Sequence, residues 1–120
     1  MTISNYGELA FLDTLRNVSF AVATTYIKLH LGDPGEAGTA NPAAETTRKA
    51  ITFSAAASGS MVSSATVTWT NVSNTETYSH WSLWDASTAG NCLWSGAFSS
   101  SAAVTAGDTF QITSLTLTLD

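Results

Sequence analysis

Basic residues and cysteine are scarce in this sequence, and each shortage excludes a class of protein. Four Lys and Arg residues stand against nine Asp and Glu residues, giving a net charge of −5. Only Arg48 and Lys49 are adjacent, whereas binding to a phosphate backbone requires clustered basic side chains. We therefore expect no direct binding to nucleic acid. The single Cys92 excludes an internal disulfide and any multi-cysteine metal site, and in an apolar strand it is expected to be a small buried hydrophobe.

Long apolar runs and charge in general are scarce as well. No stretch approaches the ~20 apolar residues of a membrane span, and the first ten residues lack the basic start and apolar run of a secretory signal. We expect no contact with a membrane. Charged residues make up 11% of the chain, less than half the usual share of about 25%. This composition is typical of β-rich domains, and of surfaces that meet other subunits, because interface cores are depleted in charge.

Two neighbouring stretches, residues 78–85 and 90–98, carry three of the four tryptophans and are the centre of the predicted fold. Along the first stretch Trp81 and Leu83 alternate with His80, Ser82 and Trp84, and a period of two indicates a β-strand. Residues 86–90 are small or polar and end in the Gly of a Gly-Asn pair, which suits a turn. We therefore predict a β-hairpin with both faces partly covered, whose aromatic side chains form the centre of the core.

The N-terminal segment has helical period. Asn5 can cap a helix, Glu8 follows three residues later as in a capping box, and apolar residues then recur in two adjacent rows. We predict a helix over residues 6–17. It either plugs an open end of the sheet structure or is an arm that docks onto another subunit, and the pattern leaves both interpretations open.

Further short alternating runs lie at residues 23–31, 48–53, 65–70, 109–112 and 115–119, and polar or small residues separate them. Residues 54–60 and 99–101 are interpreted as a linker and a loop. With a length suited to one domain, the pattern predicts a single mainly β domain over residues 1–120: an antiparallel β-sandwich of seven to eight short strands, jelly-roll or Ig-like, with one short N-terminal helix. The predicted core contains Ile27, Leu29, Leu31, Val67, Trp69, Trp81, Leu83, Leu93, Leu115, Leu117 and Leu119.

A stretch without periodicity, residues 32–47, is predicted to be a long loop. Loops of this length in a compact domain usually have a function. Asp33 and Glu36 are too few to hold a hard cation, which needs six or more oxygens, and no Lys follows the glycines as in a phosphate loop. We expect the loop to make intersubunit contacts, with the helix as a second contact element. The candidate contact residues are Asp33, Pro34, Gly35, Glu36, Asn41, Pro42 and Glu45.

Catalytic patterns are weak. His30 and His80, with Asp85 or Asp33, are the one combination that resembles a zinc site, but strand histidines are more often half-buried side chains with a hydrogen bond. No serine lies in a nucleophile-elbow pattern, and no pair of carboxylates suggests a glycosidase. We expect no enzyme activity and no cofactor. The tryptophans Trp69, Trp81, Trp84 and Trp94 leave open a different class, a carbohydrate-binding module that stacks sugars on exposed rings.

Several segments resemble a family of small virion proteins of tailed bacteriophages. Residues 29–39 (LHLGDPGEAGT) are similar to its LHTxDPGExGT segment, and residues 83–86 (LWDA) with 90–96 (GNCLWSG) are similar to LWDA…GNLLWxG. Residues 106–110 (AGDTF) and the ending 115–120 (LTLTLD) match its AGDTF and LTVTLD. The resemblance runs from the N-terminal helix to the last residue. It implies a virion component, since members of the family are labelled tail-fibre or structural proteins.

Composition and resemblance together favour a capsid decoration (cement) protein that binds the outer capsid surface and stabilises the shell. The alternative is a tail-fibre or tail-tip component, although no shaft of repeats follows the last strand. Under either hypothesis the expected partners are the major capsid protein or tail proteins, and further copies of the chain as a homotrimer or homodimer. The expected location is the virion, with the host cytoplasm during assembly.

Overall fold

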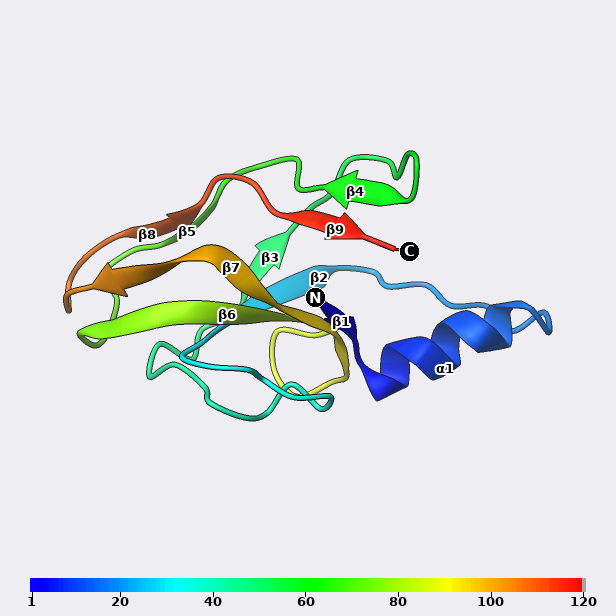
Figure 1. Cartoon of the computed structure of the whole chain (residues 1–120), viewed down its shortest axis with the longest axis horizontal. Coiled ribbons are helices and arrows are strands. Elements are labelled where there is room, and N and C mark those ends of the chain that lie inside the picture. Colours follow the sequence, from blue (N-terminus) through cyan, green and yellow to red (C-terminus); the bar gives the residue numbers. More distant parts are fainter. Residues whose placement is uncertain (120) are drawn as a thin grey trace.

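The computed structural model describes residues 1–119; Asp120, the last residue of the LTLTLD ending, lies outside the described residues. One helix, α1, is followed by most of the strands in Figure 1. The elements are β1 (Thr2–Ile3), α1 (Asn5–Thr14), β2 (Thr25–His30), β3 (Lys49–Ile51), β4 (Ser60–Val62), β5 (Val67–Trp69), β6 (Glu76–Trp84), β7 (Cys92–Val104), β8 (Phe110–Ile112) and β9 (Thr116–Thr118).

The predicted antiparallel β-sandwich with a short N-terminal helix is confirmed. One layer is a five-stranded sheet in the order β1-β7-β6-β2-β3, and every pair in it is antiparallel. The other layer consists of two ribbons, β4 with β9 and β5 with β8, which Figure 1 shows above the large sheet. The long β6–β7 hairpin forms the middle of the larger sheet, as the alternation in residues 78–98 predicts.

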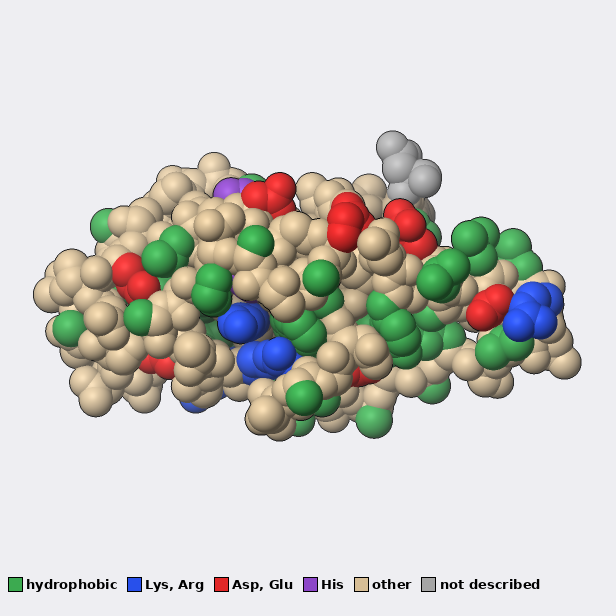
Figure 2. All heavy atoms as spheres, turned by 90° about the horizontal axis from the view of Figure 1, so that it is seen from below, with side chains coloured by type: hydrophobic (Ala, Val, Ile, Leu, Met, Phe, Trp, Pro, Cys, Tyr) green, Lys and Arg blue, Asp and Glu red, His purple; other side chains and the backbone are tan. Residues whose placement is uncertain are grey.

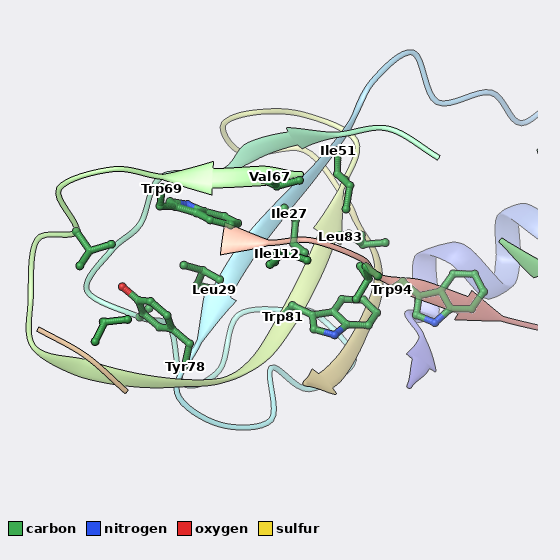
Figure 3. Packing of buried hydrophobic residues seen from close by; sticks show 14 of the residues in the cluster. Ile27, Leu29, Ile51, Val67, Trp69, Tyr78, Trp81, Leu83, Trp94 and Ile112 are labelled. Carbon is green, nitrogen blue, oxygen red and sulfur yellow. The ribbon is translucent and has the colours of Figure 1, made fainter. Parts of the chain in front are cut away.

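The core lies between the two layers (Figure 3). Trp69 and Tyr78 fill one end of it, Trp94 fills the end nearest α1, and Trp81 and Leu83 lie between them. Trp81 packs against Gly96 on the neighbouring strand, where an added Cβ would lie 2.6 Å from the indole. A glycine at this position therefore provides the space for the indole of Trp81.

Leu93 is half-buried rather than fully buried, because β7 has a bulge at this residue. The register pairs Leu83 with Trp94 and Trp84 with Cys92, which leaves Leu93 as an extra residue without a partner. An extra residue reverses the alternation on one side of it. Trp94, at 9% exposure, therefore faces the core in place of Leu93.

Two further leucines expected in the core, Leu31 and Leu119, are exposed at 44% and 50%. Each follows the last residue of a strand, β2 or β9, where the chain leaves the sheet and the alternation no longer applies. The predicted loop at residues 99–101 is also wrong, since these residues belong to β7. The sequence signal there reflects a second irregularity: the pairing of His80 with Ala97 shifts to Tyr78 with Ala102.

The helix is shorter than predicted and begins one residue earlier. Its N-cap is Ser4, whose Oγ accepts a hydrogen bond from the Gly7 amide at 3.0 Å and donates one to the Cys92 carbonyl. The backbone amide of Ser4 also donates to the Leu93 carbonyl at 3.1 Å. These bonds continue the pairing of β1 with the edge of β7. The sequence pattern does not reveal β1, which has only two residues.

Candidate interaction surfaces

Residues 31–48, the contact loop, fold back over the outer face of the five-stranded sheet. The Leu31 amide donates to the Asn41 carbonyl at 2.8 Å, and the Ala43 amide donates to the Leu29 carbonyl at 3.2 Å. Pro34 and Ala43 are buried against the sheet. The loop is therefore a covering layer with a defined conformation, which explains why both faces of the central strands are covered.

His30 links this loop to the sheet through both ring nitrogens. Its Nδ1 lies 2.9 Å from the Ala40 carbonyl, and its Nε2 lies 2.7 Å from Ser82 Oγ on β6. A carbonyl only accepts, so Nδ1 carries the proton and Nε2 accepts from the Ser82 hydroxyl. Ser82 Oγ in turn accepts from Trp84 Nε1 at 2.7 Å. The chain of bonds requires a neutral imidazole at His30.

Burial lowers the pKa of His30 below its ordinary value, because the charged ring would lose its hydration; the nearby Lys28 and His80 charges add to this effect. The hydrogen bonds that the ring makes with the backbone act in the opposite direction and do not overcome burial. Protonating Nε2 would also make it a second donor to Ser82 Oγ beside Trp84 Nε1, and the Ser82 hydroxyl proton would lose its acceptor. The ring therefore acts as a structural link between loop and sheet.

Arg48 joins the end of the loop to the β6–β7 turn. Its guanidinium lies 3.9 Å above the centre of the Trp84 ring, and its Nη1 donates to the carbonyls of Ala86 and Ala89 at 2.9 and 2.7 Å. Gly38 of the loop packs beside the same ring and beside Cys92. Burial raises the pKa of the Cys92 thiol to about 11, as expected for the small buried side chain predicted at this position.

The Glu76 carboxylate at the start of β6 holds the loop at residues 44 and 45. Glu76 accepts the backbone amides of Ala44 and Glu45 at 3.0 and 3.1 Å, one on each carboxylate oxygen. Glu45 in turn accepts the Ser73 amide at 3.3 Å. The acid predicted at position 45 to contact another subunit is therefore half-buried and hydrogen-bonded within the chain.

The other candidate contact residues divide into two groups. Pro34 is buried, so it supports the loop from beneath. Asp33 accepts the Gly35 amide at 2.9 Å, and Asn41 donates to the Asp33 carbonyl at the same distance, so both also shape the loop. The exposed residues of the set are Asp33, Gly35, Glu36, Asn41 and Pro42. They form an outer edge whose conformation is set by the contacts beneath it.

The residues that fix this edge were not identified from the sequence. The sequence placed Ser82 and Trp84 on the less apolar face of the hairpin and Arg48 at the start of a strand, as one of two adjacent basic residues, and it gave Glu76 no role. One signal was present: Arg48 is a basic residue at the end of the loop, and its partner Trp84 occupies the less apolar face of the predicted hairpin.

The end of the molecule next to α1 is open and apolar. Phe11 of α1 contacts Phe20 and Trp94, with ring centroids 5.7 and 6.5 Å apart, and Tyr6 contacts Phe20 at 6.2 Å. A pocket of about 230 Å³ lies between α1 and the sheets, lined by Phe11, Phe20, Phe53, Met61, Trp94 and Leu117. Of the ten residues of α1, all within the described part of the chain, Gly7 alone is buried.

The two histidines are directly opposite each other, because His30 pairs with His80 in the register of β2 and β6. His80 Nδ1 lies 2.8 Å from Ser79 Oγ, and both rings of the pair thus have hydrogen-bond partners. Within residues 1–119, no group of three His, Cys, Asp or Glu side chains could hold a metal ion. In the same residues, no helix is long and apolar enough to cross a membrane.

All four tryptophans are buried, with exposures of 1% for Trp69, 2% for Trp81, 6% for Trp84 and 9% for Trp94. Stacking a sugar requires an exposed ring face. The carbohydrate-binding interpretation therefore loses the feature on which it depended.

The fold and these surfaces define a small β-sandwich with two regions available for contacts, the outer edge of the loop and the α1 end. The family model described as podophage GP4 fiber I protein gp80 matches residues 2–120. The chain therefore belongs to this family and is a phage virion structural protein, in agreement with the virion component that the motifs predict. A comparison with curated proteins gives no match.

Proposed function

We propose that this chain is a structural component of a virion fibre in a tailed phage, where it serves as a binding module. The observation that carries the proposal is that the match to the fiber I family model spans the whole sandwich and α1. The chain is also elongated, with extents of 48 × 26 × 23 Å, and its large apolar surface lies at one end. An elongated module of this kind suits an attachment that uses its two regions separately.

The outer edge of the contact loop is the proposed attachment surface to another virion protein, either a tail protein or the major capsid protein. Its conformation is set by His30, Arg48 and Glu76, so binding does not have to pay the entropy of ordering a flexible segment. The outward carboxylates of Asp33 and Glu36 would face basic groups of the partner. Exposed ion pairs contribute only about 0–1 kcal/mol each, so repeated copies would hold through multivalency.

A capsid decoration protein is the second candidate. The low charge content of 11% favours it, because a protein that covers a shell in many copies meets other subunits over much of its surface. The outer edge of the contact loop has a defined conformation, which suits binding to the repeating capsid surface as well as binding to one attachment site in a fibre.

Copy number and position in the particle distinguish the two candidates. Quantitative mass spectrometry of purified virions gives the ratio of this chain to the major capsid protein, and an antibody against the chain locates it by electron microscopy. A fibre component is expected in tens of copies or fewer, at fibres. Hundreds of copies spread over the shell would replace the fibre proposal with the decoration one, and absence from purified virions would contradict both.

The attachment surface is tested by reversing one exposed charge. Glu36→Lys is expected to lower incorporation into particles, whereas Thr88→Lys, which adds a lysine on the exposed β6–β7 turn, is the control and should leave incorporation unchanged. Both variants should fold as the parent does, because both positions are exposed. Full incorporation of Glu36→Lys would show that the loop edge is not the contact.

A further inference from the structure

Most of the exposed large apolar side chains gather at the α1 end. Leu9, Leu12 and Leu15 are exposed at 67%, 63% and 86%. Seven of the ten large apolar residues that are exposed within residues 1–119 belong to this end: Tyr6, Leu9, Phe11, Leu12, Leu15, Val18 and Leu119. Figure 2 shows hydrophobic side chains gathered over this end of the molecule. We call these seven residues the α1 patch.

Within its own chain α1 is held by its first turn and by the aromatic contacts of Tyr6 and Phe11, while its leucines are exposed. A ten-residue helix is marginal in water by itself, since isolated helices below about 12–15 residues rarely persist. Its first turn is fixed by the Ser4 cap and by Gly7, which lies against the Leu93 carbonyl. Beyond that turn the leucines extend into solvent. The packing that such a helix needs must come largely from another surface.

We propose that the α1 patch pairs with the α1 patch of a second copy of this chain, forming a two-fold dimer. The available area supports this occupant. The seven side chains are exposed at 40–86%, so with the lower bound of ~150 Å² for a large side chain the patch offers on the order of 600 Å². A standard interface buries about 800 Å² on each partner, whereas the largest patch on a typical monomer is about 300–600 Å².

The charge distribution also favours a second copy. Within residues 1–24 the charged side chains are Glu8, Asp13 and Arg16, and Arg16 pairs with Asp13 at 2.8 Å. This segment therefore carries a side-chain charge of −1, and the remaining seven acids and three basic residues carry −4 of the total −5. Because Arg16 pairs with Asp13, each α1 patch brings a net side-chain charge of only −1 to the pairing, so little repulsion opposes it. A strongly charged partner would find almost no charge there to pair with.

The α1 end carries a groove as well as projecting side chains. Beside the projecting leucines lies an apolar groove of about 220 Å³, lined by Phe11, Met61, Trp94, Leu117 and Leu119. In a two-fold arrangement each copy places leucines of α1 in the groove of the other copy. The same contact then forms twice, and the leucines and grooves of both copies are buried. The inference concerns the isolated chain and is independent of which virion protein the contact loop binds.

Light scattering coupled to gel filtration tests the pairing. At tens of micromolar, the parent chain is expected at twice its 12.5 kDa mass. The double variant Leu12→Glu/Leu15→Glu is expected at the single-chain mass, with a dimer dissociation constant raised at least 100-fold. Leu31→Glu is the matched control, because Leu31 is an exposed leucine outside α1, and it should stay dimeric. Circular dichroism confirms that each variant folds.

A single-chain mass for the parent at 100 micromolar would overturn the proposal, as would a double variant that remains dimeric. Three or more chains in the parent would overturn the two-fold pairing. Cysteine cross-linking gives a second measurement, since the native Cys92 is buried. At least one of Leu9→Cys, Leu12→Cys and Leu15→Cys should form a disulfide-linked dimer, and Thr88→Cys should not. Failure of all three, or equal cross-linking at Thr88, would contradict the interface.

Discussion

The guanidinium of Arg48 lies 3.9 Å above the ring of Trp84 and at the same time donates to two carbonyls of the β6–β7 turn. This one contact connects three segments that are far apart in sequence: the end of the contact loop, the last residue of β6 and the hairpin turn. It explains how a loop of this length is held in one conformation.

Replacing Arg48 with Lys should therefore destabilise the protein although the charge is kept. A lysine cannot keep the flat stacking on Trp84 while donating to both carbonyls. The expected loss in the free energy of unfolding is about 1.5–3 kcal/mol, measured by urea denaturation. Arg16→Lys, at an exposed residue of the turn after α1, is the control and should change stability by less than ~1 kcal/mol. Equal effects of the two substitutions would show that the Trp84 contact contributes nothing specific.

Stability should fall as the pH is lowered from about 7 towards 5. The pKa of His30 is lowered in the folded protein, while in the unfolded chain it is about 6.5. Below that value the unfolded state binds more protons than the folded state, so the free energy of unfolding decreases with decreasing pH. Stability is thus highest above the unfolded pKa and is lost as the pH falls towards the folded one.

Denaturation curves of the parent, His30→Gln and His80→Gln across this range test the assignment to His30. The pH dependence should persist in His80→Gln, because His80 is only half-buried, and should largely disappear in His30→Gln. If His30→Gln keeps the full dependence, another group is responsible and the neutral His30 link is not the cause.

Two glycines of the contact loop should respond differently to substitution by alanine. Gly35 and Gly38 have similar positive φ angles of 74° and 71°, but an added Cβ meets nothing within 4 Å at Gly35 and lies 2.5 Å from Cys92 Sγ at Gly38. Gly35→Ala should cost only the backbone strain of about 1–2 kcal/mol. Gly38→Ala should cost clearly more in thermal or urea unfolding. Equal losses would mean that the loop can move away from Cys92 without penalty.

Trp81→Ala should strongly destabilise the core. The indole is 2% exposed and packs on Gly96, so its removal leaves a cavity between the layers and should cost about 3–5 kcal/mol. Leu93→Ala, at the half-buried bulge residue, should cost much less. A loss below about 1 kcal/mol for Trp81→Ala in urea denaturation would contradict the burial of this face.

The sequence by itself determined the class of fold and its central hairpin. The alternation of Trp81 and Leu83 with His80 and Ser82 is a local property of an extended chain, and it identifies β6 and its core face without knowledge of any partner. The same holds for the alternation of Leu115 and Leu117, and for the loop that the glycines and Pro34 introduce. The family motifs were also local, and they led to the virion class.

Only the tertiary structure decided which way the irregular positions face and what the contact loop does. The bulge at Leu93 arises from the pairing of two strands, so alternation within one strand could not predict that Trp94 would take its place. His30 and Arg48 appeared to be an outward strand residue and part of a basic pair, because their partners Ser82 and Trp84 lie far along the chain. The leucine rows of α1 predicted a helix, but a row shows only that a face is apolar. Whether that face meets its own sheet or remains uncovered depends on where Ser4 and β1 attach the helix to β7.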